Sequence, residues 1–137
     1  MIILSKLKRL FLTIIINTII RVFDNFVPKD NNLWLFGMDQ GGGNRFAGNS
    51  WYLFKYIQQN QKKIKPVCIT NSTFVKEQIK KINGQYCKPN TWKSFYYALR
   101  AKVNICAYDM ATDLTNFSKK GTINVNIWHG MIIKKIG

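Results

Sequence analysis

The sequence has 137 residues, of which 47% are hydrophobic and 14% aromatic. A chain of this length forms one domain with its own core, and this composition excludes an intrinsically disordered protein. The formal charge of +15, from 21 basic and 6 acidic residues, predicts an anionic partner: nucleic acid, a phospholipid surface or a phosphorylated substrate.

The first 27 residues have the pattern of an amphipathic helix, with an apolar face and a polar face. The apolar face holds Leu4, Leu7, Phe11, Ile14, Ile15, Val22 and Phe26. The polar face holds Lys6, Arg9, Thr13, Asn17, Arg21 and Asp24. The apolar run of residues 10–20 is too short to span a bilayer, and residues 25–28 lack the small side chains of a signal-peptide cleavage site. We expect a helix that lies in the interface of an anionic membrane; the alternative is a helix packed on the domain or on a partner.

Residues 28–32 read as a polar linker, and the chain then alternates between strands and helices up to residue 137. Strands are predicted at 33–37, 66–70, 85–88, 103–107 and 123–127 from short apolar or alternating runs. Two helices are predicted from their N-caps, one at Asn49 or Ser50 and one at Ser72 or Thr73. The second of these is expected to end at Gly84. A third helix is predicted over residues 91–101. Phe95, Tyr96 and Leu99 should form the core face of the last helix. This order predicts an α/β fold with a Rossmann-like parallel sheet flanked by helices.

The three cysteines, Cys68, Cys87 and Cys106, form no C-x-x-C pair, and the single histidine cannot complete a usual zinc site. Their neighbours are apolar or strand-like, so we expect buried, reduced thiols, as in a cytoplasmic protein. No motif requires a metal or a cofactor.

The C-terminal strand runs into Trp128-His129-Gly130, so the only histidine follows the end of a strand. Ligands of open α/β sheets bind at the carboxyl ends of the strands. A histidine there can accept a proton near neutral pH, and Lys134 and Lys135 can bind phosphate. The alternative is a histidine with only a structural role at the end of the strand.

These residues closely resemble the W-H-G-x-P-[LI]-K-K signature of the CDP-glycerol glycerophosphotransferase family, with Ile132 in place of the proline. The family also has a glycine, a basic residue and an aromatic before N-[SP]-K-x-L-[FY]. Gly43, Arg45 and Phe46 match the first part; Asn49, Ser50, Leu53 and Phe54 match the second, with Trp51 in place of the lysine. Residues 95–103 resemble a further family segment, Y-x-L-A-x-A-K.

The resemblance covers residues 33–137 and implies the N-terminal, acceptor-side domain of a two-domain fold of the GT-B type. The half that binds CDP would follow it, so we expect a truncated member, inactive alone unless a companion chain supplies that half. The implied reaction transfers glycerol phosphate from CDP-glycerol to a lipid-linked teichoic acid or related acceptor, at the cytoplasmic face of the bacterial membrane.

The resemblance makes His129 the general base and assigns phosphate binding to Arg45, Lys134 and Lys135, with Gly130 beside them. Asp109 and Asp113, in the loop after the strand at 103–107, are further candidates for the same cleft, and Asp109 is the better of the two. Two other functions remain open: a membrane-peripheral domain that binds the acceptor without catalysis, and a basic nucleic-acid-binding protein. No nucleic-acid-binding motif supports the second, and we expect no nucleic-acid partner.

Overall fold

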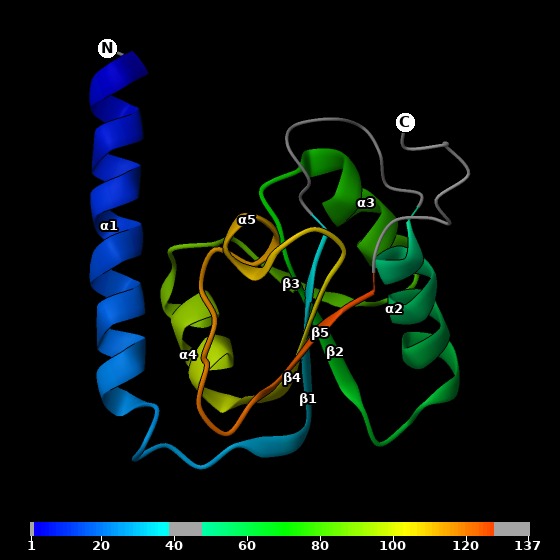
Figure 1. The fold of residues 1–137 in the computed structure, drawn as a ribbon. Coiled ribbons are helices and arrows are strands. Elements are labelled where there is room, and N and C mark those ends of the chain that lie inside the picture. The colour runs from blue at the N-terminus through cyan, green and yellow to red at the C-terminus, as the bar shows by residue number, and fades with distance from the viewer. Residues whose placement is uncertain (1, 39–47, 128–137) are drawn as a thin grey trace, which may run out of the picture.

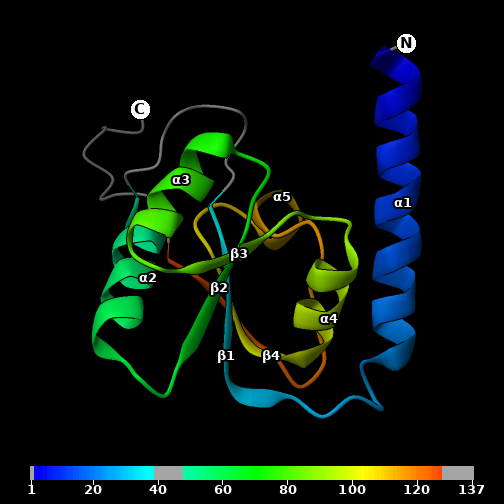
Figure 2. The same ribbon diagram turned by 180° about the vertical axis from the view of Figure 1, so that it is seen from behind.

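The computed structural model describes residues 2–38 and 48–127, and Figures 1 and 2 show it from opposite sides. It contains a five-stranded parallel sheet with the strand order β3-β2-β1-β4-β5. The strands are β1 (Asp30–Gly37), β2 (Lys65–Ile69), β3 (Gln85–Cys87), β4 (Ala101–Cys106) and β5 (Ile123–Asn126). The helices are α1 (Ile2–Phe23), α2 (Asn49–Asn60), α3 (Thr73–Lys81), α4 (Trp92–Arg100) and α5 (Met110–Asp113). The predicted Rossmann-like α/β fold is confirmed.

Helices cover both faces of the sheet: α2 and α3 lie on one face, α4 on the other, and α1 stands outside α4 (Figures 1 and 2). Alternate residues of β1 point into two separate cores. Leu33 and Leu35 pack in the core on the α4 side, whereas Phe36 packs in the core on the α2 and α3 side. There its ring meets the edge of Phe54 at 5.3 Å between centroids. Because both faces are covered, residues 33–37 form a continuous apolar run.

Two strands begin earlier than their apolar residues predict. β1 begins at Asp30, whose backbone pairs with Ala101 across an irregularity in the register. β4 begins at Ala101, directly after α4 ends at Arg100. Polar residues can start a strand when a neighbouring strand supplies hydrogen bonds, and an apolar pattern does not detect such residues.

The start of α2 differs from the prediction. Its N-cap is Gly48, and no side chain caps it, so the predicted caps Asn49 and Ser50 are wrong. The Asn49 side chain instead donates a hydrogen bond to the carbonyl of Ile127 at 3.2 Å, and Ser50 is buried in the first turn. Glycine is an acceptable N-cap because its backbone adopts the extended conformation at no cost.

The predicted cap of α3 is confirmed, since Ser72 accepts a hydrogen bond from the backbone N–H of Val75 at 3.3 Å. At its other end the left-handed residue is Asn83, with φ of 54°, and not the predicted Gly84. The N–H of Gly84 donates to the carbonyl of Ile79 at 2.9 Å, as in a Schellman motif. A β-carbon on Gly84 would lie 2.7 Å from the Ile79 side chain, so this position requires glycine for close packing.

Helix α4 begins with a capping box formed by Thr91 and Ser94. Leu99 is buried and Phe95 is half-buried against the core, as predicted. The prediction for Tyr96 is wrong, because 58% of its surface is exposed. The inner face of α4 consists of Ser94, Ala98 and Leu99, so its small side chains bring the helix close to the sheet and leave Tyr96 outside.

The N-terminal helix is confirmed as α1, but its polar side faces the domain. The amide nitrogen of Asn17 donates to the carbonyl of Thr115 at 2.9 Å, and that of Asn90 donates to the Thr13 hydroxyl at 2.7 Å. The apolar face is exposed to solvent, with Leu4, Leu7, Phe11, Ile14, Ile15 and Val22 between 38% and 74% exposed. Within residues 2–38 and 48–127, no helix is long and apolar enough to cross a membrane.

A buried ion pair connects the end of α1 to the domain. The Lys29 ammonium lies 3.0 Å from a carboxylate oxygen of Asp24 and also donates to the Leu99 carbonyl and the Ser118 hydroxyl, each at 2.7 Å. Ser118 donates to Asp24 as well. Burial opposes ionisation of Asp24, but the hydrogen bonds from Ser118 and Lys29 outweigh it, and the pKa of Asp24 is lowered. Asp24, Lys29 and Ser118, called the Asp24 cluster below, hold the end of α1 against the domain.

The three cysteines are buried and form no disulfide bond, as predicted. Burial raises the pKa of Cys87 to about 12 and, together with the nearby carboxylates of Asp113 and Asp109, raises that of Cys106 to about 11. Both thiols are therefore protonated at neutral pH and are weak nucleophiles.

Candidate functional site

The strand order defines where a ligand site is expected in this sheet. β2 lies on one side of β1 and β4 on the other. The connection from the carboxyl end of β1 therefore leads to one side of the sheet, to β2, and the connection from the carboxyl end of β4 leads to the other side, to β5. Such a switch point is the common ligand site of open α/β sheets, because the connecting loops separate and leave a crevice. The residues at this edge are those that end β1, β4 and β5 and those that begin α2 and α5 (Figure 1).

Gly37 and Asp113 pack together at the end of β1. A β-carbon on Gly37 would lie 2.5 Å from the Asp113 β-carbon and 2.6 Å from its carbonyl carbon. Glycine is therefore required for α5 to approach the strand. Asp113 is buried, and one of its carboxylate oxygens accepts hydrogen bonds from the N–H groups of Ala107 at 2.8 Å and Tyr108 at 2.9 Å. This carboxylate holds the backbone that leaves β4.

A second set of hydrogen bonds joins β5 to its neighbours. The Asn126 side chain donates to the Tyr108 carbonyl at 2.6 Å, and the Ile127 N–H donates to the Cys106 carbonyl at 2.9 Å. Asn49, in the first turn of α2, donates to the Ile127 carbonyl. The backbone before Trp128 and His129 is thus bonded on three sides, to β4, to the loop after β4 and to α2.

The N-terminus of α2 also lies at this edge. The Ser50 hydroxyl is buried and has no hydrogen-bond partner among the residues that the structure describes. A helix N-terminus concentrates backbone N–H groups and the positive end of the helix dipole, which favour an anionic ligand. The first turn of α2 is therefore suited to a phosphate group that approaches the carboxyl edge.

Asp109 lies at the same edge, but its side chain caps α5. One carboxylate oxygen accepts from the Ala111 N–H at 2.9 Å, and the other accepts from the Thr112 hydroxyl. The hydrogen bond from Thr112 is the main cause that lowers the pKa of Asp109. A carboxylate with a lowered pKa is a weak base, so this geometry favours a capping role for Asp109 over proton transfer.

The other predicted site residues, Arg45, His129, Gly130, Lys134 and Lys135, lie outside the described residues. The described residues next to them in sequence are Met38, Gly48 and Ile127, which follow β1, precede α2 and follow β5. Within residues 2–38 and 48–127, no group of three or more His, Cys, Asp or Glu side chains is placed to hold a metal ion.

Asp113, a candidate beside Asp109, does lie at this edge. Two further residues of the edge were not predicted to act here: Asn126 and, as a side-chain donor to β5, Asn49. Their sequence signal is weak, because a polar residue after a strand is equally common in a solvent-exposed loop. These asparagines become informative only when the tertiary structure brings the Ile127 carbonyl beside Asn49 and the Tyr108 carbonyl beside Asn126.

Comparison with known families agrees with this geometry. Residues 19–137 match the model of the family described as CDP-Glycerol:Poly(glycerophosphate) glycerophosphotransferase. The chain belongs to this family. The match includes the whole described sheet and both segments that hold the predicted site residues. No curated protein and no solved structure matches the chain.

Membership of the glycerophosphotransferase family indicates a transferase function of this type. The carboxyl edge of the sheet is the common ligand site of open α/β folds. There the described residues supply a helix N-terminus, a buried hydroxyl and a backbone held by three asparagine and aspartate side chains.

Proposed function

We propose that this chain serves the transfer of glycerol phosphate from CDP-glycerol to a hydroxyl group of a lipid-linked polyol-phosphate acceptor, such as a teichoic acid chain. The observation that carries the proposal is the family match over residues 19–137. The resemblance of Trp128-His129-Gly130 and Lys134-Lys135 to the family signature lies within that match.

In the proposed reaction the acceptor oxygen attacks the phosphorus that bears glycerol, a new P–O bond forms, and the bond to CMP breaks. CMP leaves with the bridging oxygen, and the hydroxyl proton passes to His129, which acts as the general base. Arg45, Lys134 and Lys135 balance the phosphate charges, because phosphoryl transfer depends mainly on positioning and charge neutralisation. Gly130 leaves room for a phosphate beside the backbone.

The bonded backbone at Ile127 supports this role for His129. General-base catalysis requires the base to be held within hydrogen-bond reach of its proton. The bonds from Asn49 and to Cys106 restrain the residue that precedes Trp128. Asn49 also matches the family pattern around residues 43–54, which supports a shared positioning function.

We further propose that α1 binds the cytoplasmic face of the bacterial membrane. Its outer face is apolar and exposed, and the chain carries a formal charge of +15. An apolar helix face together with a basic surface is the combination that binds anionic bilayers. The first turns of α1 extend past the carboxyl edge of the sheet (Figure 1), so a membrane-bound acceptor would be near the proposed site.

A test of the catalytic proposal compares His129→Ala and His129→Gln with the unchanged chain. CMP release from CDP-glycerol is measured with the chain alone and after addition of the C-terminal half of a family enzyme. We expect activity in the complete mixture, and a loss of about 100- to 10,000-fold in kcat for both variants. Their melting temperatures should stay unchanged. A variant that loses stability but keeps its kcat per folded molecule would exclude His129 from the reaction.

The alternative function is a membrane-bound domain that binds the acceptor without catalysis. The exposed apolar face of α1 supports it, because membrane binding through this face does not require a reaction. Activity in the complete mixture that requires His129 would exclude this alternative. Binding of the lipid-linked acceptor without CMP release in any mixture would support it instead. Sedimentation with anionic vesicles, with and without residues 1–27, tests the membrane proposal; equal sedimentation of both chains would contradict it.

A further inference from the structure

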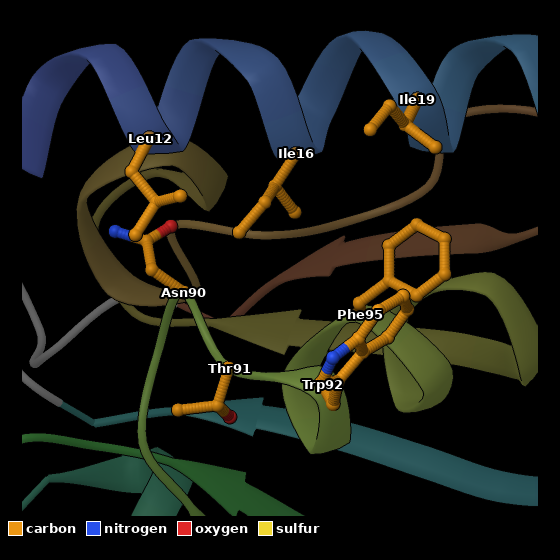
Figure 3. A pocket seen from close by; sticks show the side chains of 7 residues that line it. All are labelled: Leu12, Ile16, Ile19, Asn90, Thr91, Trp92 and Phe95. Carbon is orange, nitrogen blue, oxygen red and sulfur yellow. The ribbon is translucent and has the colours of Figure 1, made fainter.

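An apolar groove lies between α1 and the start of α4, on the side of the molecule where α1 stands (Figure 3). It has a volume of about 280 Å³ and is lined by Leu12, Ile16, Ile19, Asn90, Thr91, Trp92 and Phe95. Figure 3 shows Leu12 beside Asn90 and Ile16 pointing from α1 into the space above α4, where Trp92 and Phe95 lie. These two rings meet edge to face at 5.5 Å between centroids.

The side chains of Asn90 and Thr91 in the wall of the groove already have hydrogen-bond partners in the protein. The Asn90 amide donates to Thr13 at 2.7 Å, and its oxygen accepts from Asn116 at 3.0 Å. The Thr91 hydroxyl donates to the Lys88 carbonyl at 2.8 Å. Apart from the indole N–H of Trp92, the lining side chains therefore offer a ligand hydrocarbon and aromatic carbon.

The size of the groove selects for a slender apolar ligand. Apolar cavities of about 150 Å³ in proteins bind a single benzene ring, and drug-sized ligands occupy sites of about 300–1,000 Å³. At about 280 Å³, the groove has the volume for part of one hydrocarbon chain. Its walls are partly open, since Leu12 is 42% exposed and Trp92 is 83% exposed, so a chain can enter from the side.

A basic surface adjoins the groove. Lys88 and Lys93 line a neighbouring hollow that shares Thr91 and Trp92 with the groove. None of the lining residues of either hollow is acidic. An anionic headgroup at these lysines would lie next to a chain in the groove, and an indole ring at the boundary is typical of proteins at the membrane interface.

The groove is also continuous with the outer face of α1. Ile19, at its wall, is followed around the helix by Ile15 and Val22, which are exposed. Exposed apolar patches of this kind mark interaction surfaces. If the outer face lies in a membrane, the groove opens at the same level as the lipid chains.

We propose that the groove between α1 and α4 binds one hydrocarbon chain of an anionic phospholipid from the bilayer, with the headgroup at Lys88 and Lys93. This inference rests on the proposed membrane association of α1 and is independent of the proposed transfer reaction. The bound lipid chain would contact both α1 and α4 and so hold α1 against the domain in the membrane-bound state.

The test uses dihexanoyl phosphatidylglycerol below its micelle concentration, because a monomeric lipid can fill a groove but cannot form a bilayer. Binding is measured by titration calorimetry and by the emission of Trp92 in a chain with Trp34, Trp51 and Trp128 replaced by Phe. We expect saturable binding of one lipid per chain. Leu12→Gln should weaken lipid binding about tenfold, because the lipid chain loses its apolar contact with the Leu12 side chain.

Leu7→Gln is the matched control, because it makes the same substitution on the same helix outside the groove, at a residue that is 57% exposed. It should leave the binding of monomeric lipid unchanged and reduce sedimentation with phosphatidylglycerol vesicles. Lys93→Gln should weaken binding of dihexanoyl phosphatidylglycerol but not of the zwitterionic phosphatidylcholine analogue. Circular dichroism checks that each variant remains folded.

The outcomes separate this inference from the membrane proposal. Vesicle binding without any binding of monomeric lipid would overturn the groove inference and leave the membrane proposal intact. Monomeric binding without vesicle binding would overturn the membrane proposal, and with it the bilayer as the source of the lipid, while the affinity of the groove for a hydrocarbon chain would stand. Equal weakening by Leu12→Gln and Leu7→Gln would also overturn the groove inference. So would a dimer in solution that Leu12→Gln converts to monomers, because a second copy would then occupy the groove.

Discussion

The sheet and the N-terminal helix are held in opposite ways. The sheet is stabilised by two cores of buried apolar side chains, one on each face. Helix α1 is attached largely by hydrogen bonds that Asn17 donates and that Thr13 and Asp24 accept, with Ile20 as a fully buried apolar contact. Its outer face is apolar. In most globular proteins the apolar face of a helix meets the core. The reverse arrangement of α1 supports the proposal that its outer face binds a membrane.

The two modes of attachment have different consequences. Apolar packing is non-directional, and its strength follows the area removed from water. Hydrogen bonds and a buried ion pair require defined geometry, so they determine which side of α1 faces outward. We therefore expect core substitutions to reduce stability most, and substitutions at the polar contacts to release α1 while the sheet stays folded.

The largest effect is expected from Phe54→Ala. Phe54 is fully buried and packs against Phe36 and Trp51. Removal of a buried aromatic ring costs about 3–5 kcal/mol, because the cavity refills only in part. Denaturant unfolding measures the free energy of unfolding. Tyr56→Ala, on the exposed side of the same helix, is the control and should change it little; a similar loss in both variants would contradict the core assignment.

The next largest loss of stability is expected from Asp24→Asn. The Asp24 carboxylate is 2% exposed and its partner Lys29 is 9% exposed, so the substitution leaves a buried ammonium without its counter-charge. The expected loss is about 3 kcal/mol. Proteolysis should also cut the junction after α1 sooner, while the buried Cys68 stays protected from thiol reagents.

Asp30→Asn is the matched control for Asp24→Asn. It breaks the ion pair with Lys65 at 3.3 Å, in which the lysine is 63% exposed. Exposed pairs contribute about 0–1 kcal/mol, since water and salt screen them. Equal losses for Asp24→Asn and Asp30→Asn would show that burial of the Asp24 cluster contributes nothing to the attachment of α1.

The pH dependence should follow the lowered pKa of Asp24. In the unfolded chain an aspartate titrates near pH ~3.9, so the stabilisation from the folded carboxylate is fully present above that pH. It is lost as the pH falls through the lower, folded pKa. The difference in unfolding free energy between the unchanged chain and Asp24→Asn should therefore be constant from pH 5 to 7, on the order of the effect at neutral pH, and should shrink below about pH 4. A difference that does not shrink at all as the pH falls below the unfolded-state pKa would contradict this origin.

The smallest effect is expected from Asn17→Ala. It removes the hydrogen bond to the Thr115 carbonyl and a longer contact of 3.4 Å from Asn116. A single neutral hydrogen bond contributes about 1 kcal/mol. Thr18→Ala, one residue further on the exposed side, should leave the attachment of α1 unchanged. If Asn17→Ala has no effect on stability or on proteolysis after α1, the polar contacts are not what orients the helix.

Much of the fold could be predicted because its signals are local. The apolar run at residues 33–37 and the Ser72 cap each depend on a few neighbouring residues, and both were confirmed. The burial of the cysteines followed from their apolar neighbours. The short helix α5 was missed, because four residues are too few to show a helical period.

The candidate site could be predicted in part. The family signature at residues 128–135 selects His129 and the two lysines from the sequence. It gives no indication that Asp113 approaches Gly37, or that Asn49 reaches Ile127, since these partners are far apart in the chain. Asp109 was selected from its place after a strand, whereas its hydrogen bonds to Ala111 and Thr112 show a capping role.

By itself, the sequence determined the class of the fold, the family and the presence of an amphipathic N-terminal helix, because periodicity and motifs depend on residues near one another in the chain. Only the tertiary structure decided which face of that helix meets the domain. Thr13, Asn17 and Asp24 read as solvent-facing residues until Asn90, Thr115 and Ser118 supply their hydrogen-bond partners. A polar side chain is buried when a distant residue satisfies it, and hydropathy carries no record of that partner.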